Sequence, residues 1–277
     1  MSVKNEIPRT SWEEHYRDYQ SKLATRYLIP TLQEWGVRFD GSTVLEVGCG
    51  DGGCGAALSH HGSHVVMMDI EERRVATAER LNLKEGIDAK MFVGDILDAE
   101  GDVYREGPFD LVMFRDVMEH LAEPERALEI VRTHLTREGR VFVVFPPYYS
   151  PYGAHQQILP RKTFAFIPYN KLPYLQLLPR AWFRSFVRGD TEAHREVERL
   201  SRIRLTLSKF ERHVQAAGFR VLRKRLYLSR PSFALRYRAP VIRASFLGRI
   251  PVLNEAVVTA AYYLLEPLES RGTRRVT

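Results

Sequence analysis

A glycine-rich run between residues 44 and 53 is the part of the sequence best suited to bind a nucleotide. It reads VLEVGCGDGG in one-letter code, so a short apolar stretch leads directly into closely spaced glycines. Glycine permits a sharp turn and lets the backbone approach a ligand, and a helix that follows the turn offers unbonded N–H groups. The run therefore predicts a ligand-binding turn between a buried strand and a helix.

Three acidic residues stand at or near the ends of successive predicted strands. Glu46 lies two residues before the first glycine, Asp69 ends the second apolar run, and Asp95 follows the third. Asp69 is placed to accept hydrogen bonds from both hydroxyls of a ribose. Asp95 could meet an adenine amino group while Ile96 packs against the ring. Together the three acids predict a nucleoside cofactor.

Two details favour S-adenosylmethionine over a nicotinamide dinucleotide. Glu46 could pair with the amino group of a cationic ligand, and the glycines follow the spacing G-x-G-x-G rather than the dinucleotide spacing G-x-G-x-x-G. The predicted cofactor-binding residues are Glu46, Gly48, Cys49, Gly50, Gly52, Asp69, Ile70, Asp95, Ile96 and Arg115.

Alternating strands and helices must position these loops. Apolar runs predict strands at 43–47, 64–69, 89–93, 110–114 and 140–145. Helical spacing predicts helices at 11–35, 53–60, 71–83 and 124–135. A helix at 207–217 and a strand at 219–228 follow later, whereas residues 257–265 fit either a strand or a helix. This alternation predicts an α/β fold with a mostly parallel sheet covered by helices on both faces.

The motif residues resemble the class I S-adenosylmethionine-dependent methyltransferase superfamily, in particular its ubiquinone-biosynthesis O-methyltransferase branch. They are residues 46–52, Asp69, the pair 94–95, the run 109–112 and the pair 119–120. The resemblance is good over roughly residues 40–146. It implies a Rossmann-like sheet of seven strands, the last antiparallel, with the cofactor at the carboxyl edge of the strands. It also implies an N-terminal cover, to which Tyr16, Tyr19 and Arg26 could belong.

An acidic and histidine-containing segment follows the fourth predicted strand. On a helical turn Asp116 would lie one turn before both Glu119 and His120, so that the three side chains could converge. His155, after the fifth strand, could join them. Two carboxylates and two imidazoles suit Mn²⁺, Co²⁺, Fe²⁺ or Zn²⁺, with Mg²⁺ less natural. The four residues are similar to the metal-binding element of small-RNA 3′-terminal 2′-O-methyltransferases, with Asp116 in place of a glutamate.

A site without a metal is the alternative. A bound metal would lower the pKa of the acceptor oxygen and orient it for methyl transfer. Without it, His155 or His120 would be the general base, because imidazole titrates near neutral pH. Both versions stay open at the level of sequence, and Asp116, His120 and His155 are the catalytic candidates.

The segment 147–204 interrupts the regular alternation. It is rich in proline, tyrosine, phenylalanine and leucine, and Arg180, Arg184 and Arg188 recur at four-residue spacing. We expect a substrate-side insertion or lid, with Tyr148, Tyr149 and Tyr152 lining the acceptor pocket. The predicted division is an N-terminal cover at 1–40, a cofactor-binding core at 41–146, the insertion at 147–204 and a C-terminal completion of the sheet at 205–277.

The formal net charge of +7 is unevenly distributed. Residues 177–250 contain 18 Lys and Arg against 5 Asp and Glu. Such a segment indicates an anionic partner, either a membrane surface, a phosphorylated substrate or nucleic acid, unless it is simply a solvated basic surface. The abundant Leu-Pro pairs and tyrosines fit a small or lipidic acceptor better than nucleic acid. The sequence says nothing of oligomeric state.

The expected cellular location depends on three features that the sequence lacks: a membrane-spanning run, a secretory signal and a cysteine framework. No apolar run approaches the roughly 20 residues needed to span a bilayer. The first twelve residues do not form a secretory signal. Cys49 and Cys54 have no further cysteine with which to form a zinc site or a disulfide framework. We therefore expect reduced thiols and a cytoplasmic protein that could associate peripherally with a membrane.

The leading functional hypothesis is O-methylation of a hydroxyl on a sugar, lipid, quinone or natural product. The alternatives are methylation of an RNA 3′ end at the 2′ oxygen, N- or C-methylation of a small molecule, and a non-catalytic interaction module. The intact glycines and site acids argue against the last of these. A nicotinamide-dependent dehydrogenase is disfavoured by the glycine spacing.

Overall fold

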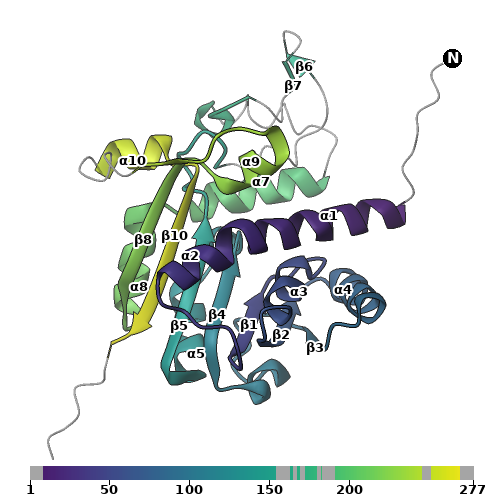
Figure 1. Ribbon diagram of the computed structural model, residues 1–277. Helices are drawn as coiled ribbons and strands as arrows, with labels where there is room; N and C mark the ends of the chain where they lie inside the picture. Colours follow the sequence, from purple (N-terminus) through teal and green to yellow (C-terminus); the bar gives the residue numbers. More distant parts are fainter. Residues whose placement is uncertain are drawn as a thin grey trace, which may run out of the picture. The chain divides into compact units, whose positions relative to one another are not determined.

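The computed structural model describes residues 9–153, 163–164, 167–168, 172–179, 182, 191–244 and 251–268 (Figure 1). Its described residues form two compact units. The first contains the residues up to Phe114, with Ile130–Val141 and Leu235–Arg238; the second contains Arg115–Glu129 and the remainder. His155 and the three arginines of the predicted basic stripe lie outside the described residues.

Among the described residues, backbone hydrogen bonds join eight strands in the order β3-β2-β1-β4-β5-β10-β8-β9. The strands are β1 (Thr43–Val47), β2 (His64–Asp69), β3 (Ala89–Val93), β4 (Phe109–Arg115), β5 (Leu135–Phe145), β8 (Phe219–Ser229), β9 (Ile242–Arg243) and β10 (Ala260–Pro267). A separate antiparallel pair is formed by β6 (Thr163–Phe164) and β7 (Ile167–Pro168). The predicted fold class is confirmed, with the two-residue β9 added at the edge beyond seven strands.

Parallel pairing brings the loops of the first unit to one edge. β1 pairs in parallel with β2 and with β4, and β2 pairs in parallel with β3. Glu46 lies opposite Met67 on one side and Met113 on the other. Because the carboxyl ends of parallel strands lie at the same edge of a sheet, the loops after β1, β2 and β3 share that edge. β1 and β2 are almost entirely buried, as strands covered on both faces must be.

The N-terminal helix is continuous but changes its hydrogen-bonding pattern near its end. It comprises α1 (Arg9–Leu23), a π-helical turn η1 (Ala24–Leu28) and α2 (Ile29–Glu34). Ile29 donates its N–H to the carbonyl of Ala24, five residues back. Pro30 follows at once and has no N–H to continue the α-helical ladder, which accounts for the local change. Gly36, at φ +88°, ends the helix as predicted.

Four other helices lie close to their predicted positions, namely α3 (Gly53–Ser59), α4 (Glu72–Glu85), α5 (Pro124–Thr133) and α8 (Leu207–Ala216). The sequence did not predict α7 (Thr191–Ile203), α9 (Pro231–Tyr237) or α10 (Pro251–Val257). Thr206 caps α8 by accepting a hydrogen bond from the Lys209 N–H, and Gly218 follows the helix at φ +77°. The region 257–265, which the sequence left undecided, is largely strand β10 and pairs antiparallel with β8.

An aromatic cluster forms the core of the second unit. Phe210 of α8 packs against Phe145 of β5 and Tyr263 of β10, with ring centroids 4.9 Å apart in both cases. All three side chains are fully buried. Such tilted aromatic contacts stabilise a core beyond the effect of buried area. None of the described helices is long and apolar enough to cross a membrane.

Candidate functional site

The glycine loop after β1 adopts the sharp turn that its sequence predicts. Gly48, Gly50 and Gly52 have φ values of +69°, +56° and +75°. These angles lie in the left-handed region, where a side chain would be strained. The N–H groups of Gly48 and Cys49 both donate to the carbonyl of Met68, at 2.8 and 3.0 Å. The loop is thereby fixed to the end of β2 before the chain enters α3.

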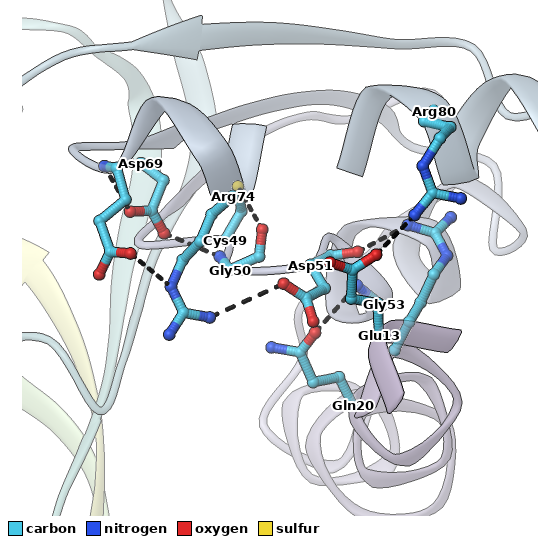
Figure 2. A network of polar contacts seen from close by, with 11 residues as sticks. Glu13, Gln20, Cys49, Gly50, Asp51, Gly53, Asp69, Arg74 and Arg80 are labelled. Atoms are coloured by element: carbon cyan, nitrogen blue, oxygen red, sulfur yellow. Dashed lines mark hydrogen bonds and ion pairs between the residues drawn. The ribbon is translucent and has the colours of Figure 1, made fainter. Parts of the chain in front are cut away.

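Asp69 connects the glycine loop to the loop after β2. Its Oδ2 accepts the N–H of Gly50 at 2.9 Å and its Oδ1 accepts the N–H of Glu71 at 3.0 Å (Figure 2). The carboxylate is buried to 8% exposure. Each carboxylate oxygen can accept more than one hydrogen bond, so both retain capacity for a ligand hydroxyl. Ile70, the next residue, is 67% exposed, which leaves an apolar side chain available beside the acid.

Arg74 of α4 joins the loops after β1 and β2. Its Nη1 lies 3.7 Å from Oδ1 of Asp51, and its Nε lies 3.3 Å from Oε2 of Glu71 (Figure 2). Burial raises the pKa of the Asp51 carboxyl more than the guanidinium of Arg74 lowers it. Sequence reasoning missed Arg74. The available signal was a basic residue in the first turn of a helix, where the helix dipole disfavours it.

The N-terminal helix α1 covers the glycine loop through two buried polar side chains. Arg17, 3% exposed, donates to the carbonyl of Asp51 at 2.9 Å. Gln20, 2% exposed, accepts the N–H of Gly53 at 3.3 Å. A Cβ on Gly53 would lie 2.2 Å from the carbonyl oxygen of Arg17, so only glycine allows this close approach.

The aromatic residues suggested for the N-terminal cover have other contacts. Tyr16 stacks on Tyr19, and the guanidinium of Arg236 lies 4.5 Å from the Tyr19 ring centroid. A role of Tyr16, Tyr19 and Arg26 at the cofactor stays a prediction. Arg17 and Gln20 were missed by the sequence reasoning, although their spacing of three residues places them on one side of the helix.

The remaining cofactor candidates differ in exposure. Glu46 is 1% exposed, and a Cβ on Gly55 of α3 would lie 3.0 Å from its Oε2. Asp95 is exposed and accepts the N–H of Leu97 at 3.0 Å. Ile96 is buried to 3% exposure, and its carbonyl accepts the hydroxyl of Tyr104. Asp95 therefore has a carboxylate accessible at the strand edge.

In the second unit, the segment after β4 departs from the predicted helical turn. Asp116 has a φ of +55°, and the short 3₁₀ helix η3 covers only Met118–His120. The N–H of Asp116 donates to the carbonyl of Val144 at 2.8 Å. Its carboxylate accepts from Arg230, and Nη1 of Arg115 lies 3.8 Å away. The prediction that Asp116 shares a helical turn with Glu119 and His120 is therefore wrong, because the left-handed residue breaks the helical path.

His120 lies between two carboxylates. Its Nδ1 is 2.5 Å from Oε1 of Glu196, on α7, and its Nε2 is 3.9 Å from Oε1 of Glu119. Burial by itself lowers the pKa of His120. The hydrogen bond to Glu196 and the negative charges of Glu119, Glu196 and Asp116 outweigh that effect and raise the pKa above its ordinary value.

Glu196 was not identified from the sequence. A signal was present, since residues 177–250 hold only five acidic residues and three of them fall within α7, namely Glu192, Glu196 and Glu198. An acidic cluster in a basic segment indicates that the acids have specific partners.

The described residues do not form the predicted metal site. Within them, no group of three or more His, Cys, Asp and Glu side chains is arranged to hold a metal ion. Arg230 contacts both oxygens of Asp116. A guanidinium and a divalent cation compete for the same carboxylate oxygens, so Asp116 in this arrangement does not fit its predicted role as a metal ligand. The fourth predicted ligand, His155, lies outside the described residues.

The loop after β5 contains the predicted pocket tyrosines. Tyr148 is 6% exposed, and its N–H donates to the carbonyl of Leu205 at 2.8 Å. Gln176 donates to the carbonyl of Tyr148 at 2.9 Å. Tyr149 is 37% exposed, and Tyr152 packs edge-on against Phe233. Their role in acceptor binding stays a prediction.

Residues 45–141 match the family model of a methyltransferase domain. The chain is 28% identical over 157 residues to the ubiquinone biosynthesis O-methyltransferase of Caulobacter vibrioides, covering 56% of this chain and 61% of that protein. It is 27% identical over 188 residues to the protein of the same name from Pseudomonas aeruginosa, covering 64% of this chain and 74% of the relative. The chain thus spans about three fifths of the length of the first of these relatives.

Two solved structures share the fold across most of the chain. An S-adenosylmethionine-dependent methyltransferase from Clostridium acetobutylicum has a TM-score of 0.55 at 12% identity, covering 89% of this chain and 92% of the other. The magnesium protoporphyrin IX methyltransferase from Synechocystis has a TM-score of 0.54 at 13% identity, covering 95% and 88%. These structures establish the fold, and the sequence matches establish the domain. Residues 45–141 are thus a methyltransferase domain, and the chain is similar to the ubiquinone biosynthesis O-methyltransferases and shares the fold of S-adenosylmethionine-dependent methyltransferases.

Proposed function

We propose that this chain transfers the methyl group of S-adenosylmethionine to a hydroxyl oxygen of a small-molecule acceptor. The observation that carries the proposal is the connection between Asp69 and Gly50. It fixes a buried carboxylate beside a turn of left-handed glycines, the arrangement in which nucleoside-binding folds accept a ribose. The relatives named ubiquinone biosynthesis O-methyltransferases favour oxygen as the methylated atom, and the quinone in that name makes a catechol the first acceptor to test.

The residues of the first unit fit an adenosylmethionine ligand. The oxygens of Asp69 that already accept two N–H groups have the capacity to accept two ribose hydroxyls. Ile70 offers an exposed apolar side chain to the adenine ring, and the exposed Asp95 offers an acceptor for its amino group. The buried Glu46 would pair with the ammonium group of the methionine portion. Left-handed glycines leave space that Cβ atoms would otherwise fill.

His120 is the proposed general base. S-adenosylmethionine, when bound, supplies a methyl group activated by its attachment to a sulfonium. In the reaction the new O–CH₃ bond forms as the S–CH₃ bond breaks, and the bonding electron pair stays on sulfur. The hydroxyl proton leaves the acceptor oxygen and passes to His120 Nε2. Such proton transfer contributes on the order of 10²- to 10⁴-fold to rate.

A bound metal is not included in this proposal, because Arg230 contacts both oxygens of Asp116 and the described residues contain no group of three or more side chains arranged to hold one. His120 carries an imidazole that can accept the proton, and a neutral hydroxyl must lose its proton to attack efficiently. In this proposal the loop tyrosines bind the acceptor, whereas the catalytic or metal-binding role of His155 stays a prediction from the sequence.

The test uses the purified chain, methyl-labelled S-adenosylmethionine and four acceptors: a catechol, an aliphatic alcohol, a primary amine and a short RNA. The proposal expects an O-methylated catechol, and about 100-fold less product from His120→Gln. Calorimetry with S-adenosylhomocysteine measures cofactor binding separately. Absence of cofactor binding, or labelling of the amine or the RNA in place of the catechol, would overturn the proposal.

A further inference from the structure

Glu196 makes a short contact with His120 across 76 positions of sequence. The Nδ1–Oε1 distance is 2.5 Å, and the side chains of His120 and Glu196 are 22% and 21% exposed. An imidazole nitrogen this close to a carboxylate is attracted to it only when that nitrogen carries a hydrogen, because its lone pair would be repelled. The contact therefore fixes the orientation of the imidazole ring relative to α7.

The other oxygen of Glu196 also has a partner. Nη1 of Arg199, one turn later on α7, lies 3.8 Å from Oε2 of Glu196. This arrangement leaves Oε1 directed at His120 and restrains rotation of the carboxylate.

The position of Glu196 determines which nitrogen of His120 can receive a proton. In a neutral imidazole one nitrogen carries a hydrogen and the other carries a lone pair, and the hydrogen bond of one sets the state of the other. An Nδ1–H that donates to Glu196 leaves the lone pair on Nε2. Without this carboxylate, either tautomer would be available to His120.

The second carboxylate, Glu119, suits the state that follows proton transfer. It lies 3.9 Å from Nε2 and is 4% exposed, too distant for a hydrogen bond but close enough for electrostatic attraction. A positively charged imidazolium would then lie between two carboxylates. The carboxylate of Asp116, which precedes Glu119 in the sequence, accepts hydrogen bonds from Arg230.

We infer that Glu196 is a positioning residue, which holds Nδ1–H of His120 and so presents Nε2 to the acceptor hydroxyl. The inference rests on the proposed function and deepens it, since it assigns a role in the reaction to α7. That helix belongs to the segment 147–204, which the sequence suggests only as a substrate cover. The base of the reaction thus depends on an element outside the matched methyltransferase domain at 45–141.

The tautomer of His120 can be measured in the protein without a methyl-acceptor substrate. Nitrogen-15 NMR of uniformly labelled protein distinguishes Nδ1–H from Nε2–H, and comparison with His120→Gln identifies this signal among the nine histidines. We expect the neutral ring to be Nδ1–H in the wild-type protein. Glu196→Gln should add or favour Nε2–H, because the carboxamide can donate to Nδ1 through its NH₂ group.

Kinetics supply the second readout. Glu196→Gln should lower kcat by about 100-fold while KM and the Kd for S-adenosylhomocysteine stay within about 2-fold, since an orienting group acts on the reacting state more than on binding. Glu196→Asp should recover part of kcat, because it keeps the negative charge. The matched control is Glu129→Gln, which removes a surface pair with Arg126 on α5 and should leave kcat unchanged.

The outcomes separate the inference from the proposed function. An Nε2–H tautomer in the wild-type protein, or wild-type kcat in Glu196→Gln, overturns the role of Glu196 even if the enzyme is an O-methyltransferase. A wild-type chain that binds no S-adenosylhomocysteine overturns the proposed function, whereas the tautomer measurement still tests the geometry. If Glu196→Gln does not fold, Glu196→Asp and the wild-type spectrum decide.

Discussion

Arg230 donates from a single guanidinium nitrogen, Nη2, to both carboxylate oxygens of Asp116, at 3.1 Å each. Asp116 has a left-handed backbone at φ +55°, which side-chain-bearing residues other than asparagine and aspartate rarely adopt. The pair therefore stabilises an unfavourable backbone immediately before the turn that carries Glu119 and His120. Asp116 is best understood as an anchor of this turn.

Substitutions at Asp116 should separate the backbone effect from the effect of the charge pair. Asp116→Ala should lower the free energy of unfolding by about 2–3 kcal/mol, because it removes a charge-assisted pair and leaves Arg230 partly buried without it. Asp116→Asn should cost less, since asparagine tolerates the left-handed region and keeps an oxygen acceptor. Urea denaturation followed by circular dichroism provides the measurement.

Asp116→Gly is the control for that comparison. Glycine adopts φ +55° without strain but offers no carboxylate to Arg230. A glycine variant as stable as the wild-type protein would show that the pair with Arg230 contributes nothing to stability.

Asp69→Asn should weaken binding of S-adenosylhomocysteine by at least about 10-fold, equivalent to roughly 1.4 kcal/mol. Asparagine has one acceptor oxygen where the carboxylate has two, and the backbone N–H groups of Gly50 and Glu71 already require acceptors. Isothermal titration calorimetry measures the effect. Asp98→Asn, at an exposed loop acid that accepts the N–H of Glu100, is the matched control. Equal affinities for the two variants would contradict a ribose-binding role for Asp69.

The strands of the cofactor-binding half could be predicted closely from sequence. β1 and β2 begin and end where their apolar runs do, because strands in a covered parallel sheet are selected for continuous burial. The bounds of β3 also match the prediction, although this edge strand is only partly covered. β5 was predicted at 140–145 but begins at Leu135. Its first residues are polar and partly exposed, so they carry no apolar signal from which a strand could be recognised.

The turn that carries Glu119 and His120 was less predictable, for a physical reason. The spacing of Asp116, Glu119 and His120 fits a helix, yet Asp116 takes a left-handed conformation stabilised by Arg230, 114 residues away. Glu196 is likewise brought to His120 from α7. Side-chain pairs between distant elements leave no periodicity in a single sequence, so both contacts had to be found in the structure. The fold class and the cofactor loop depend on local patterns and were therefore accessible.

Arg17 should contribute far more to the free energy of unfolding than the exposed Arg80 of α4. Arg17→Met removes donors to the Asp51 carbonyl, to Asn82 and to Glu85 from a side chain that is 3% exposed. We expect a loss of about 3 kcal/mol in the free energy of unfolding, because buried acceptors lose a charged partner.

Arg80→Met is the matched comparison for Arg17→Met, measured by the same urea denaturation. It removes only the exposed pair with Glu13, visible in Figure 2, and should cost about 1 kcal/mol or less. Similar losses in the two variants would mean that Arg17 does not hold the glycine loop to α1.

Metal depletion should leave methyl transfer largely intact. The carboxylate of Asp116 is held by Arg230 and His120 is held by Glu196, so the described groups need no metal to order them. After dialysis against EDTA, kcat should stay within about 2-fold of its starting value. If a metal activated the acceptor oxygen, its removal would lower kcat by far more than 2-fold. Recovery of a lost activity by adding back Mn²⁺, Co²⁺, Zn²⁺ or Mg²⁺ singly would contradict this expectation and implicate His155.

Asp51→Asn should stabilise the protein at neutral pH. Burial raises the pKa of Asp51 above its ordinary value of 3.8, with the negative charges of Glu13 and Asp69 adding to the effect and Arg74 opposing it. A carboxyl group whose pKa is higher in the folded state binds protons more readily there, so its ionisation costs stability as pH rises. Asparagine avoids that cost. The gain in free energy of unfolding should be largest near pH 7 and shrink as pH falls toward 3.8, when wild-type Asp51 becomes protonated.

Urea denaturation at several pH values, with Asp98→Asn as the exposed control, measures the difference. A gain that grows on acidification would be inconsistent with a raised pKa. Weaker binding of S-adenosylhomocysteine by the stabilised variant would show that Asp51 contributes to ligand affinity although it lowers the stability of the fold.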